Sequence, residues 1–592
     1  MLPLRSYMAP SIGPIRLSNS KRLYALIRAG NLYLTVQDAL ALAIENNLNL
    51  EIARYGPLLA DSALQRAKAG GPYRGVPSAS AQVSSVTPGV GVNGSTLSAG
   101  LSGGGGGGGG NGGANTTIEQ VGQMEPNFDP ILQSTETFSH LTEPQTNQVV
   151  SQTNALVQGV HTYNTVLNQG LITGGQFRYI DYEQYLKENA PSDYLNPVTA
   201  PYMGLWLRQP LLQGFGIALN NRDIRIARIN TFASRQAFRS EMLNLAGSVI
   251  NLYWNYASAY EELRLRQRAL AITEKFRDDT KYEISIGAIA GVELPRAEAE
   301  VASRRQDLNI AQGNLRQQAV LLKEAISHTE DPALESAGIV PLDQVEVPEE
   351  LDLPPVRQLV GTAVAQRPDV QIAKLKDETD AINLLGTTNP LLPSLTATVQ
   401  TYNRAVTGTP QLSGGTANPY FVGGYGSALG QIFRRNFPNE TANVLFSIPF
   451  ENRLAQGDYG IDQLQYRQSQ VEAQRDRNRV LVDVSSQAAA LRQARARYDV
   501  AREERVLDEQ LLAAERRKSY GPETFNYIMA DQRALIAAQL LEMNAMAAYA
   551  HARAALDQVL GTTLERYHIS LEEGLRGRVE RQSTPPVGAG GR

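Results

Sequence analysis

Residues 246–263 read AGSVINLYWNYASAYEEL and lie inside a proline-free segment that runs from Asn220 to Ser285. Apolar and aromatic side chains recur there at alternating spacings of 3 and 4 residues, at Ala246, Val249, Tyr253, Tyr256, Tyr260 and Leu263. This spacing is typical of a helix that packs along one seam against neighbouring helices. At 1.5 Å per residue, a helix over the whole segment would be roughly 100 Å long.

The helical pattern continues beyond two short breaks. After a break at Gly287 to Gly291, one apolar side chain per heptad marks a second helix, at Val301, Leu308, Leu315 and Leu322. A further long helix is marked by Leu481, Val484, Ala488, Leu491 and Tyr498. A break at Tyr520 to Pro522 follows, and then a stripe of small residues from Ala534 to Ala555. The sequence therefore predicts two pairs of long helices packed as in coiled coils.

Two parts of the chain also repeat one another. Residues 43–53, AIENNLNLEIA, align with residues 363–373, AVAQRPDVQIA, at an offset of 320. Residues 205–214, LWLRQPLLQG, align with residues 444–453, VLFSIPFENR, at an offset of 239, so the first copy carries about 81 extra residues (320 minus 239). In each copy the predicted order is helix, strand, strand, long helix, break, long helix. We therefore expect an internal two-fold repeat.

The repeat divides the chain into five parts. We expect an N-terminal extension at 1–33, a first repeat at 34–335, a linker at 336–354, a second repeat at 355–564 and a partly disordered tail at 565–592. The extra residues of the first repeat fall in a Gly-, Ser- and Thr-rich insertion at about 70–200, which contains a glycine run from Gly103 to Gly110. Such a run has no side chains to pack, so it predicts a flexible loop.

Short stretches with period-2 alternation predict strands. They are Thr162–Val166, Gln176–Tyr185, Tyr202–Gln209, Pro393–Tyr402 and Asn443–Phe450, the first two forming a hairpin around Thr173-Gly174-Gly175. Alternation fits a half-buried sheet and equally a membrane barrel with an apolar outer face. At Pro210 and Pro449 we expect turns from strand to helix, because proline ends a strand ladder and starts a helix well.

Composition excludes several classes of function. The net charge of −4 excludes a strongly basic nucleic-acid binder, and the lack of cysteine excludes disulfides and thiolate chemistry. The five histidines have no metal-ligand spacing, and no nucleophile, base and orienting group can be assembled from the sequence. A G-x-G-x-x-G at Gly89, Gly91 and Gly94 has no helical pattern after it, as a dinucleotide site would require. We expect no enzyme activity, no metal and no cofactor.

Membrane signals are sparse. No stretch reaches the length of a transmembrane helix, and the first 30 residues contain no apolar core of signal-peptide length. Either an export signal is missing from this start or the protein is not exported.

Taken together, the duplicated order of elements resembles the TolC-type outer-membrane efflux protein family, also called outer membrane factors. The local motifs that carry the resemblance are LTVQDALALAIENNLNLEIA at 34–53, LRQPLLQGFG at 207–216 and NPLLPSLTATVQTY at 389–402. The resemblance covers roughly residues 34–564. It implies a mainly α protein with a membrane β-barrel, in which three chains form an α-helical barrel and a 12-stranded β-barrel from about four strands per chain.

The resemblance also implies a function and partners. It implies a passive channel in the outer membrane, with lipid around the barrel and a long periplasmic portion, in a tripartite efflux or type I secretion system. The partners would be two further copies of the chain, a periplasmic adaptor protein and an inner-membrane pump of RND or ABC type. The cargo would be small molecules or polypeptides.

A periplasmic gate is implied at the two helix breaks, near Gly287 and Gly521. Members of the family typically carry acidic side chains just after the tip glycines. Glu293 stands at the expected place in the first repeat, whereas Asn526 stands where an acid is expected in the second repeat and Asp531 comes one step late. An acid at the start of a helix is also favoured by the helix dipole, so Glu293 is alternatively a solvated helix-start residue.

A second interpretation is a structural or adhesive coiled-coil protein that displays the Gly-rich insertion as a loop. It explains the long helices and the missing export signal. It leaves the duplicated strands unexplained.

Overall fold

The structure is a computed structural model that describes residues 13–15, 17–70, 126–146, 152–287, 289–329, 331–411, 417–517 and 522–583, apart from the side chains of 522–526. The chain divides into two compact units. The helical unit comprises Met1–Pro57, Ala233–Ala373 and Glu472–Arg592, and the sheet unit comprises Leu58–Phe232 and Lys374–Val471. The glycine run and the tail beyond Ser583, for which we predicted a flexible loop and disorder, lie outside the described residues.

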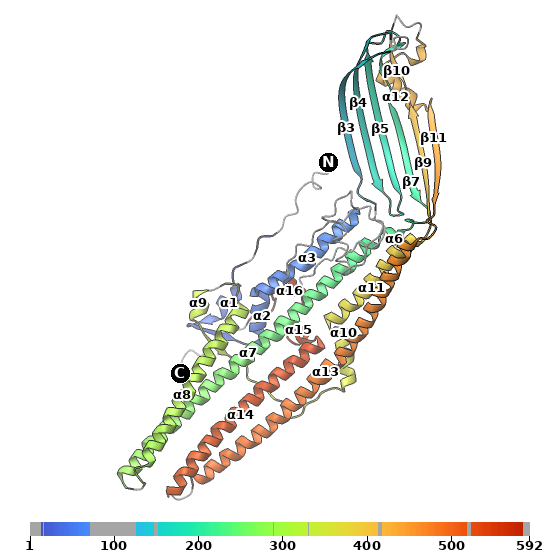
Figure 1. Cartoon of the computed structure of the whole chain (residues 1–592). Coiled ribbons are helices and arrows are strands. Elements are labelled where there is room, and N and C mark those ends of the chain that lie inside the picture. Colours follow the sequence, from blue (N-terminus) through green and yellow to red (C-terminus); the bar gives the residue numbers. More distant parts are fainter. Residues whose placement is uncertain are drawn as a thin grey trace. The chain divides into compact units, whose positions relative to one another are not determined.

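Four long helices dominate the helical unit (Figure 1). They are α7 (Arg222–Ser285), α8 (Glu293–Ile326), α13 (Arg453–Glu515) and α14 (Pro522–Leu560). The first helix was predicted from Asn220 to Ser285 and is found from Arg222 to Ser285. The proline-free segment with its 3-4 apolar spacing therefore predicted this helix correctly. Both predicted breaks are helix ends, because α7 is followed by α8 and α13 by α14. Smaller helices accompany them: α1 (Lys21–Leu26), α2 (Val36–Asn46), α9 (Pro332–Ser336), α10 (Val356–Gln366), α15 (Thr563–Arg566) and α16 (Leu571–Arg576).

The core of the helical unit is built on the predicted seam. Ala246, Val249, Tyr253 and Tyr256 are all buried, against α2 and α8 among other elements. Helix α2 is short but almost entirely buried, because its sequence VQDALALAIEN is apolar on nearly every side. A second cluster joins α10, α13 and α14 through residues such as Leu359, Val484 and Leu556. Packing, rather than intrinsic propensity, therefore holds these helices in place.

A small sheet joins segments that we predicted to be an extension and a linker. Its strands are β1 (Ile27–Arg28), β2 (Asn31–Leu34) and β8 (Gly338–Pro341), and β2 pairs with β8 in parallel. Residues 336–354 are thus not a plain linker. Strands of two to four residues are too short to show a periodic signal. The paired residues Leu34 and Pro341 are also 307 positions apart in the sequence (341 minus 34).

The sheet unit contains a large antiparallel sheet (Figure 1). In spatial order its six long strands are β3 (Ile131–Pro144), β4 (Ala155–Gly170), β5 (Gln176–Glu188), β7 (Tyr202–Pro210), β9 (Ser394–Arg404) and β11 (Pro438–Ser447). Two short strands, β6 (Leu195–Thr199) and β10 (Thr407–Pro410), pair beside β5. The helical segments that belong wholly or partly to this unit are α3 (Leu48–Ala69), α6 (Ile217–Asn220), α11 (Pro368–Thr388), α12 (Tyr425–Phe433) and the 3-10 turns η2 (Asn389–Leu391) and η3 (Pro419–Phe421).

The expectation of about four strands per chain is wrong for this sheet. The predicted hairpin is confirmed as β4 and β5, whose turn is closed by Leu171 N donating to Gly175 O at 2.8 Å. Gly174 has a φ of 90°, and an added Cβ would lie 2.1 Å from Gly214 O, so this turn requires glycine. Strand β3 was missed because ILQSTETFSHLTEP is mostly polar on both faces. The first repeat thus supplies four long strands, β3, β4, β5 and β7, whereas the second repeat supplies two, β9 and β11.

Candidate channel-gating and membrane-facing sites

The turn between α7 and α8 contains the first predicted tip glycine. Gly287 has a φ of 76°, and its N–H donates to Ile284 O at 3.0 Å. No atom lies within 4 Å of the position that a Cβ would take, so the backbone conformation alone favours glycine here. The left-handed residue lets the chain leave α7 and turn toward α8.

Glu293, the first acid after this turn, is the first residue of α8. Its placement at a helix start agrees with the alternative reading, but the side chain is not solvated, since the residue is only 9% exposed. Arg296 Nη1 donates to both carboxylate oxygens, at 2.9 and 3.1 Å. The carboxylate is therefore already compensated within its own helix.

The corresponding residues of the second break are less fully placed. Gly521 lies outside the described residues, and Asn526 lies on α14 without a described side chain. Asp531 lies on α14 and is half-buried. The predicted set of gate residues thus comes from the ends of two helix pairs, α7–α8 and α13–α14.

Sequence reasoning missed a buried carboxylate that connects the two pairs. Glu300 on α8 is 8% exposed. Arg533 on α14 donates to its Oε2 from Nε at 3.0 Å and from Nη2 at 2.6 Å. Arg304, one turn further along α8, donates to its Oε1 at 2.9 Å. Glu300 is thus held by two arginines from two helices, a charge-assisted arrangement of the strong kind.

The charge of Glu300 follows from these contacts. Burial acts to raise the pKa of its carboxyl, but the hydrogen bonds and positive charges of Arg533 and Arg304 outweigh burial and lower that pKa. Glu300 and Arg304 alone look like a solvated i,i+4 pair in the sequence. Only the partner 233 residues away distinguishes this carboxylate from its neighbours, and the sequence carries no signal for it.

Further ion pairs hold each helix pair together. Arg266 on α7 pairs with Asp307 on α8 at 3.1 Å, and Arg505 on α13 pairs with Glu542 on α14 at 2.5 Å. Arg266 and Arg505 therefore form contacts between helices.

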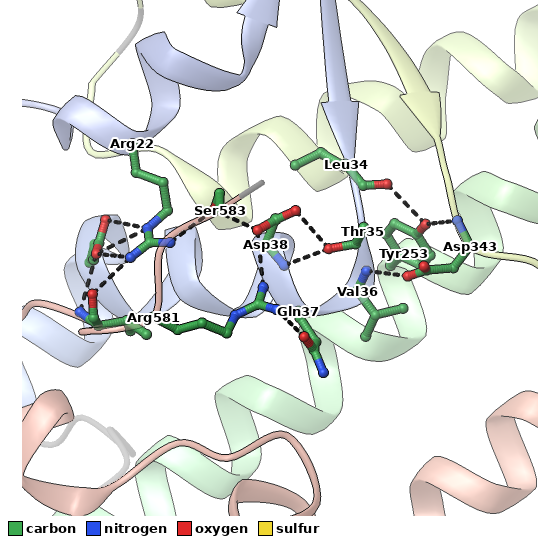
Figure 2. A network of polar contacts seen from close by, with 12 residues as sticks. Arg22, Leu34, Thr35, Val36, Gln37, Asp38, Tyr253, Asp343, Arg581 and Ser583 are labelled. Carbon is green, nitrogen blue, oxygen red and sulfur yellow. Dashed lines mark hydrogen bonds and ion pairs between the residues drawn. The ribbon is translucent and has the colours of Figure 1, made fainter. Parts of the chain in front are cut away.

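A second polar network fixes the start of α2 (Figure 2). Thr35 caps the helix, accepting from Asp38 N at 3.1 Å, and Val36 N donates to Asp343 Oδ2 at 2.6 Å. Tyr253 OH donates to Leu34 O at 3.1 Å and accepts from Asp343 N at 3.2 Å. Burial raises the pKa of the Tyr253 hydroxyl, so it stays a neutral donor.

The same network includes the C-terminal tail (Figure 2). Asp38 is 3% exposed and accepts from Ser583 Oγ at 2.5 Å and from Arg581 Nη2 at 3.1 Å. Arg22 Nη1 also donates to Ser583 Oγ, at 2.8 Å. The tail at 565–592 was predicted to be partly disordered, and its described part ends at Ser583, which is bonded to α1 and α2.

In the sheet unit, the two faces of the six long strands differ in chemistry. Residues directly opposite one another in the ladders share a face. One face carries a belt of apolar side chains on every strand, which we call the apolar belt: Leu132, Leu167, Phe177, Leu205, Leu207, Leu395, Val399, Val444 and Phe446. Leu132, Leu205, Leu207, Val399, Val444 and Phe446 are exposed to solvent in the single chain.

The opposite face is mainly polar. It carries Gln133, Asn164, Asn168, Arg178, Arg208, Thr398, Gln400 and Asn443, together with apolar side chains such as Ile131, Val166, Ile180 and Leu445. Trp206 also lies on this face, with the Arg178 guanidinium 5.1 Å from its ring centre. Beyond the apolar belt, the first face becomes acidic, at Glu136, Asp181, Glu183 and Glu440. Most of the exposed apolar side chains of the six strands thus lie on the first face, which carries the apolar belt.

The two predicted proline turns lie at the ends of strands. Pro210 is the last residue of β7 and pairs with Thr396. Pro449 lies two residues beyond the end of β11, at Ser447. Neither proline starts a helix, because α6 begins at Ile217 and α13 at Arg453.

Among the described residues, no helix is both long enough and apolar enough to span a membrane. The same residues contain no group of three or more histidines and acids placed to bind a metal ion.

Comparison with known proteins gives one family and one fold. Residues 197–328 match the model of the family described as outer membrane efflux protein. The CmeC outer membrane channel of Campylobacter jejuni shares 14% sequence identity, with 97% of this chain and 98% of that chain covered and a TM-score of 0.54. No curated protein sequence matches the chain.

Two further structures agree. VceC from Vibrio cholerae shares 14% identity over 89% of this chain and 96% of that chain, with a TM-score of 0.51. The open state of the MtrE outer membrane channel of Neisseria gonorrhoeae shares 16% identity over 89% and 88%, also with a TM-score of 0.51. At these identities the structures establish the fold alone. Residues 197–328 of this chain are thus similar to the outer membrane efflux protein family, and the chain as a whole has the fold of the CmeC, VceC and MtrE outer membrane proteins.

Proposed function

We propose that three copies of this chain form a passive exit channel in a bacterial outer membrane, as part of a tripartite efflux or type I secretion system. The observation that carries the proposal is the sheet with a band of exposed apolar side chains on one face and mainly polar side chains on the other. A barrel wall has this chemistry, with lipid outside and water inside.

The need for several copies follows from the open sheet. Six strands cannot close a barrel alone, since outer-membrane barrels have at least about eight. A sheet edge in lipid would leave its N–H and C=O groups without partners, which costs several kcal/mol per group. Three copies would remove the edges.

We propose that the ends of the α7–α8 and α13–α14 pairs form the periplasmic gate. Gly287 and Gly521 would allow the turns, and Glu293, Asn526 and Asp531 would lie near the entrance. Ion pairs such as Glu300–Arg533 support the proposal, because they hold two helix pairs together and are breakable by small movements. A periplasmic adaptor and an inner-membrane pump of RND or ABC type would bind these ends and supply the energy.

The Pro210 and Pro449 segments would form the passage from barrel to helices. Small molecules and polypeptides both fit a passive duct, so the cargo would be selected by the pump. The adhesive coiled-coil alternative is not favoured, because it gives no role to a six-stranded sheet with an apolar belt.

The test is the oligomeric state of protein extracted from membranes. We expect a trimer that requires detergent, measured by light scattering with correction for bound detergent, and a circular dichroism spectrum with strand as well as helix. Recovery of a water-soluble, purely helical dimer would overturn the proposal.

A further inference from the structure

We infer that this channel has a wider membrane barrel than four strands per chain would give, with the β3–β4 hairpin forming the seam between neighbouring copies. The inference rests on the proposed channel function. Each copy would contribute six strands, so three copies would close a barrel of about eighteen strands, within the range of bacterial outer-membrane barrels.

The first observation is that β3 and β4 belong to the sheet rather than to a separate lobe. Strand β4 pairs with β5 from Gly170↔Gln176 to Gln158↔Glu188, which is the whole length of β5. Strand β3 pairs with β4 over its full 14 residues, from Ile131 to Pro144. These are the most extensive ladders of the sheet.

The second observation is that the apolar belt continues onto the hairpin. Leu132 and Leu167 are paired with each other and share the face of Tyr179 and Leu205. An added hairpin outside the membrane would have no need of apolar side chains at the level of the belt. Strands β3 and β4 are therefore part of the wall that faces lipid.

The third observation concerns the two edges. Within the described residues, β3 and β11 each have a ladder on one side only. Both strands are exposed almost throughout, unlike the four strands between them. Strands β3 and β11 are both long, contain no lysine and have a proline only at one end. They therefore lack most of the features that usually prevent an edge strand from pairing with another chain. Such edges are suited to pair with another chain.

The occupant that fits both edges is a second copy of this chain. Every neighbouring pair of the six long strands is antiparallel, so β3 and β11 run in opposite directions. Placing β11 of one copy beside β3 of the next therefore continues an antiparallel ladder. An even number of strands per chain is required for this, and the six long strands meet the requirement.

The belt also predicts the register of the seam. The residues directly opposite one another across the six strands form one row, which runs from Leu132 on β3 to Glu440 on β11. The residues between them are Leu167, Tyr179, Leu205 and Thr401. The apolar residues of β11 on this face are Val444 and Phe446, four and six residues farther along. The belt therefore slants across the strands, as it does where barrel strands tilt by roughly 35–45°. A continuous belt places Leu132 beside Phe446 of the next copy and Ser134 beside its Val444.

The size of the pore follows from the strand number. Barrel diameter grows nearly linearly with the number of strands, so eighteen strands give roughly 1.5 times the diameter of twelve. The barrel would then be an open aqueous duct for bulkier cargo than a twelve-stranded barrel admits.

Because the chain contains no cysteine, disulfide trapping can test the seam without background. The test pairs are L132C with F446C and S134C with V444C in full-length protein, oxidised in detergent. The expected result is a covalent trimer on a denaturing gel. H140C with F446C is the off-register control, displaced by eight residues or roughly 27 Å, and should not cross-link. V166C with I180C, opposite one another in β4 and β5, should link within one chain.

The outcomes separate this inference from the channel proposal. A non-trimeric preparation would overturn the channel itself. A trimer in which V166C–I180C links, but neither seam pair does, would overturn the six-strand seam and leave the channel standing.

A deletion tests the pore size. Removing residues 128–170 takes out both strands and joins Asn127 to Leu171, a short connection because Gly170 N donates to Asn127 O at 2.7 Å. The deleted trimer should have a barrel about one third narrower in averaged electron-microscope images. An unchanged barrel diameter in a trimeric deletion variant would overturn the inference.

Discussion

Glu300 is a buried carboxylate that contacts Arg533, 233 residues away in the sequence. It is held by Arg304 from its own helix and by Arg533 from α14. Removing a buried carboxylate that two arginines share costs more than removing an exposed one, because the arginines lose their charged partner.

We expect Glu300→Gln to loosen the contact between α8 and α14. The amide accepts hydrogen bonds but carries no charge, so local opening should become about tenfold more frequent, which corresponds to about 1.4 kcal/mol. Hydrogen exchange of the α8 and α14 amides measures this. Glu298→Gln, an exposed acid on the same helix, is the matched control and should leave exchange unchanged.

The pH dependence of this contact follows from the lowered pKa of Glu300. A carboxyl whose pKa is depressed in the folded state contributes stability above its unfolded pKa of about 4.3, and this stability is lost as the pH falls through the folded value. We expect the contact to be unchanged from pH 7 to 5 and to weaken below about pH 4. Exchange rates corrected for intrinsic pH effects test this, and an equally steep loss in Glu300→Gln would contradict it.

Gly287 and Gly291 form a matched pair in the α7–α8 turn. Both have open space where a Cβ would be, but only Gly287 has a positive φ. We expect Gly287→Ala to destabilise the turn by about 1–2 kcal/mol, because alanine resists the left-handed region. Gly291→Ala should be neutral or slightly stabilising. Equal effects of the two substitutions on exchange in residues 282–293 would show that the turn is not set by Gly287.

At the scale of elements, the C-terminal tail is held by the start of α2. Asp38→Asn removes the charge that Arg581 and Ser583 contact, so the tail should detach more often. Trypsin should then cut faster at Arg576, Arg578 and Arg581. Asp61→Asn on the exposed side of α3 is the control. Unchanged cleavage in Asp38→Asn would mean that the tail is held by other contacts.

Elements differ in how far the sequence predicts them. The α7 helix was found to within two residues at its start, because a long 3-4 spacing has few alternative structures. Strand β3 was missed because its apolar residues, Ile131, Leu132, Phe138 and Leu141, do not alternate regularly with its polar residues. Strands β2 and β8 were missed because each is four residues long.

The candidate gate was only partly predictable for a similar reason. Gly287 could be identified because glycine readily adopts the left-handed backbone conformation that ends a helix, and this depends only on the local sequence. The burial of Glu293 and the Glu300–Arg533 contact depend on which helices lie side by side, and tertiary contact is not encoded in local spacing. Local rules therefore located the ends of the helices but not the interactions between them.

At the scale of the whole molecule, the two units have different tasks in the proposed channel. The sheet unit supplies an apolar band for lipid and a polar face for water. The helical unit supplies long helices that ion pairs join to one another.

Single-channel recording in a planar bilayer tests the central claim most directly. Purified trimer should give discrete conductance steps, and Glu300→Ala, which weakens the contact between the helix pairs, should raise the fraction of time spent open. A folded, trimeric Glu300→Ala protein that inserts into the bilayer and leaves the current at background would contradict the channel.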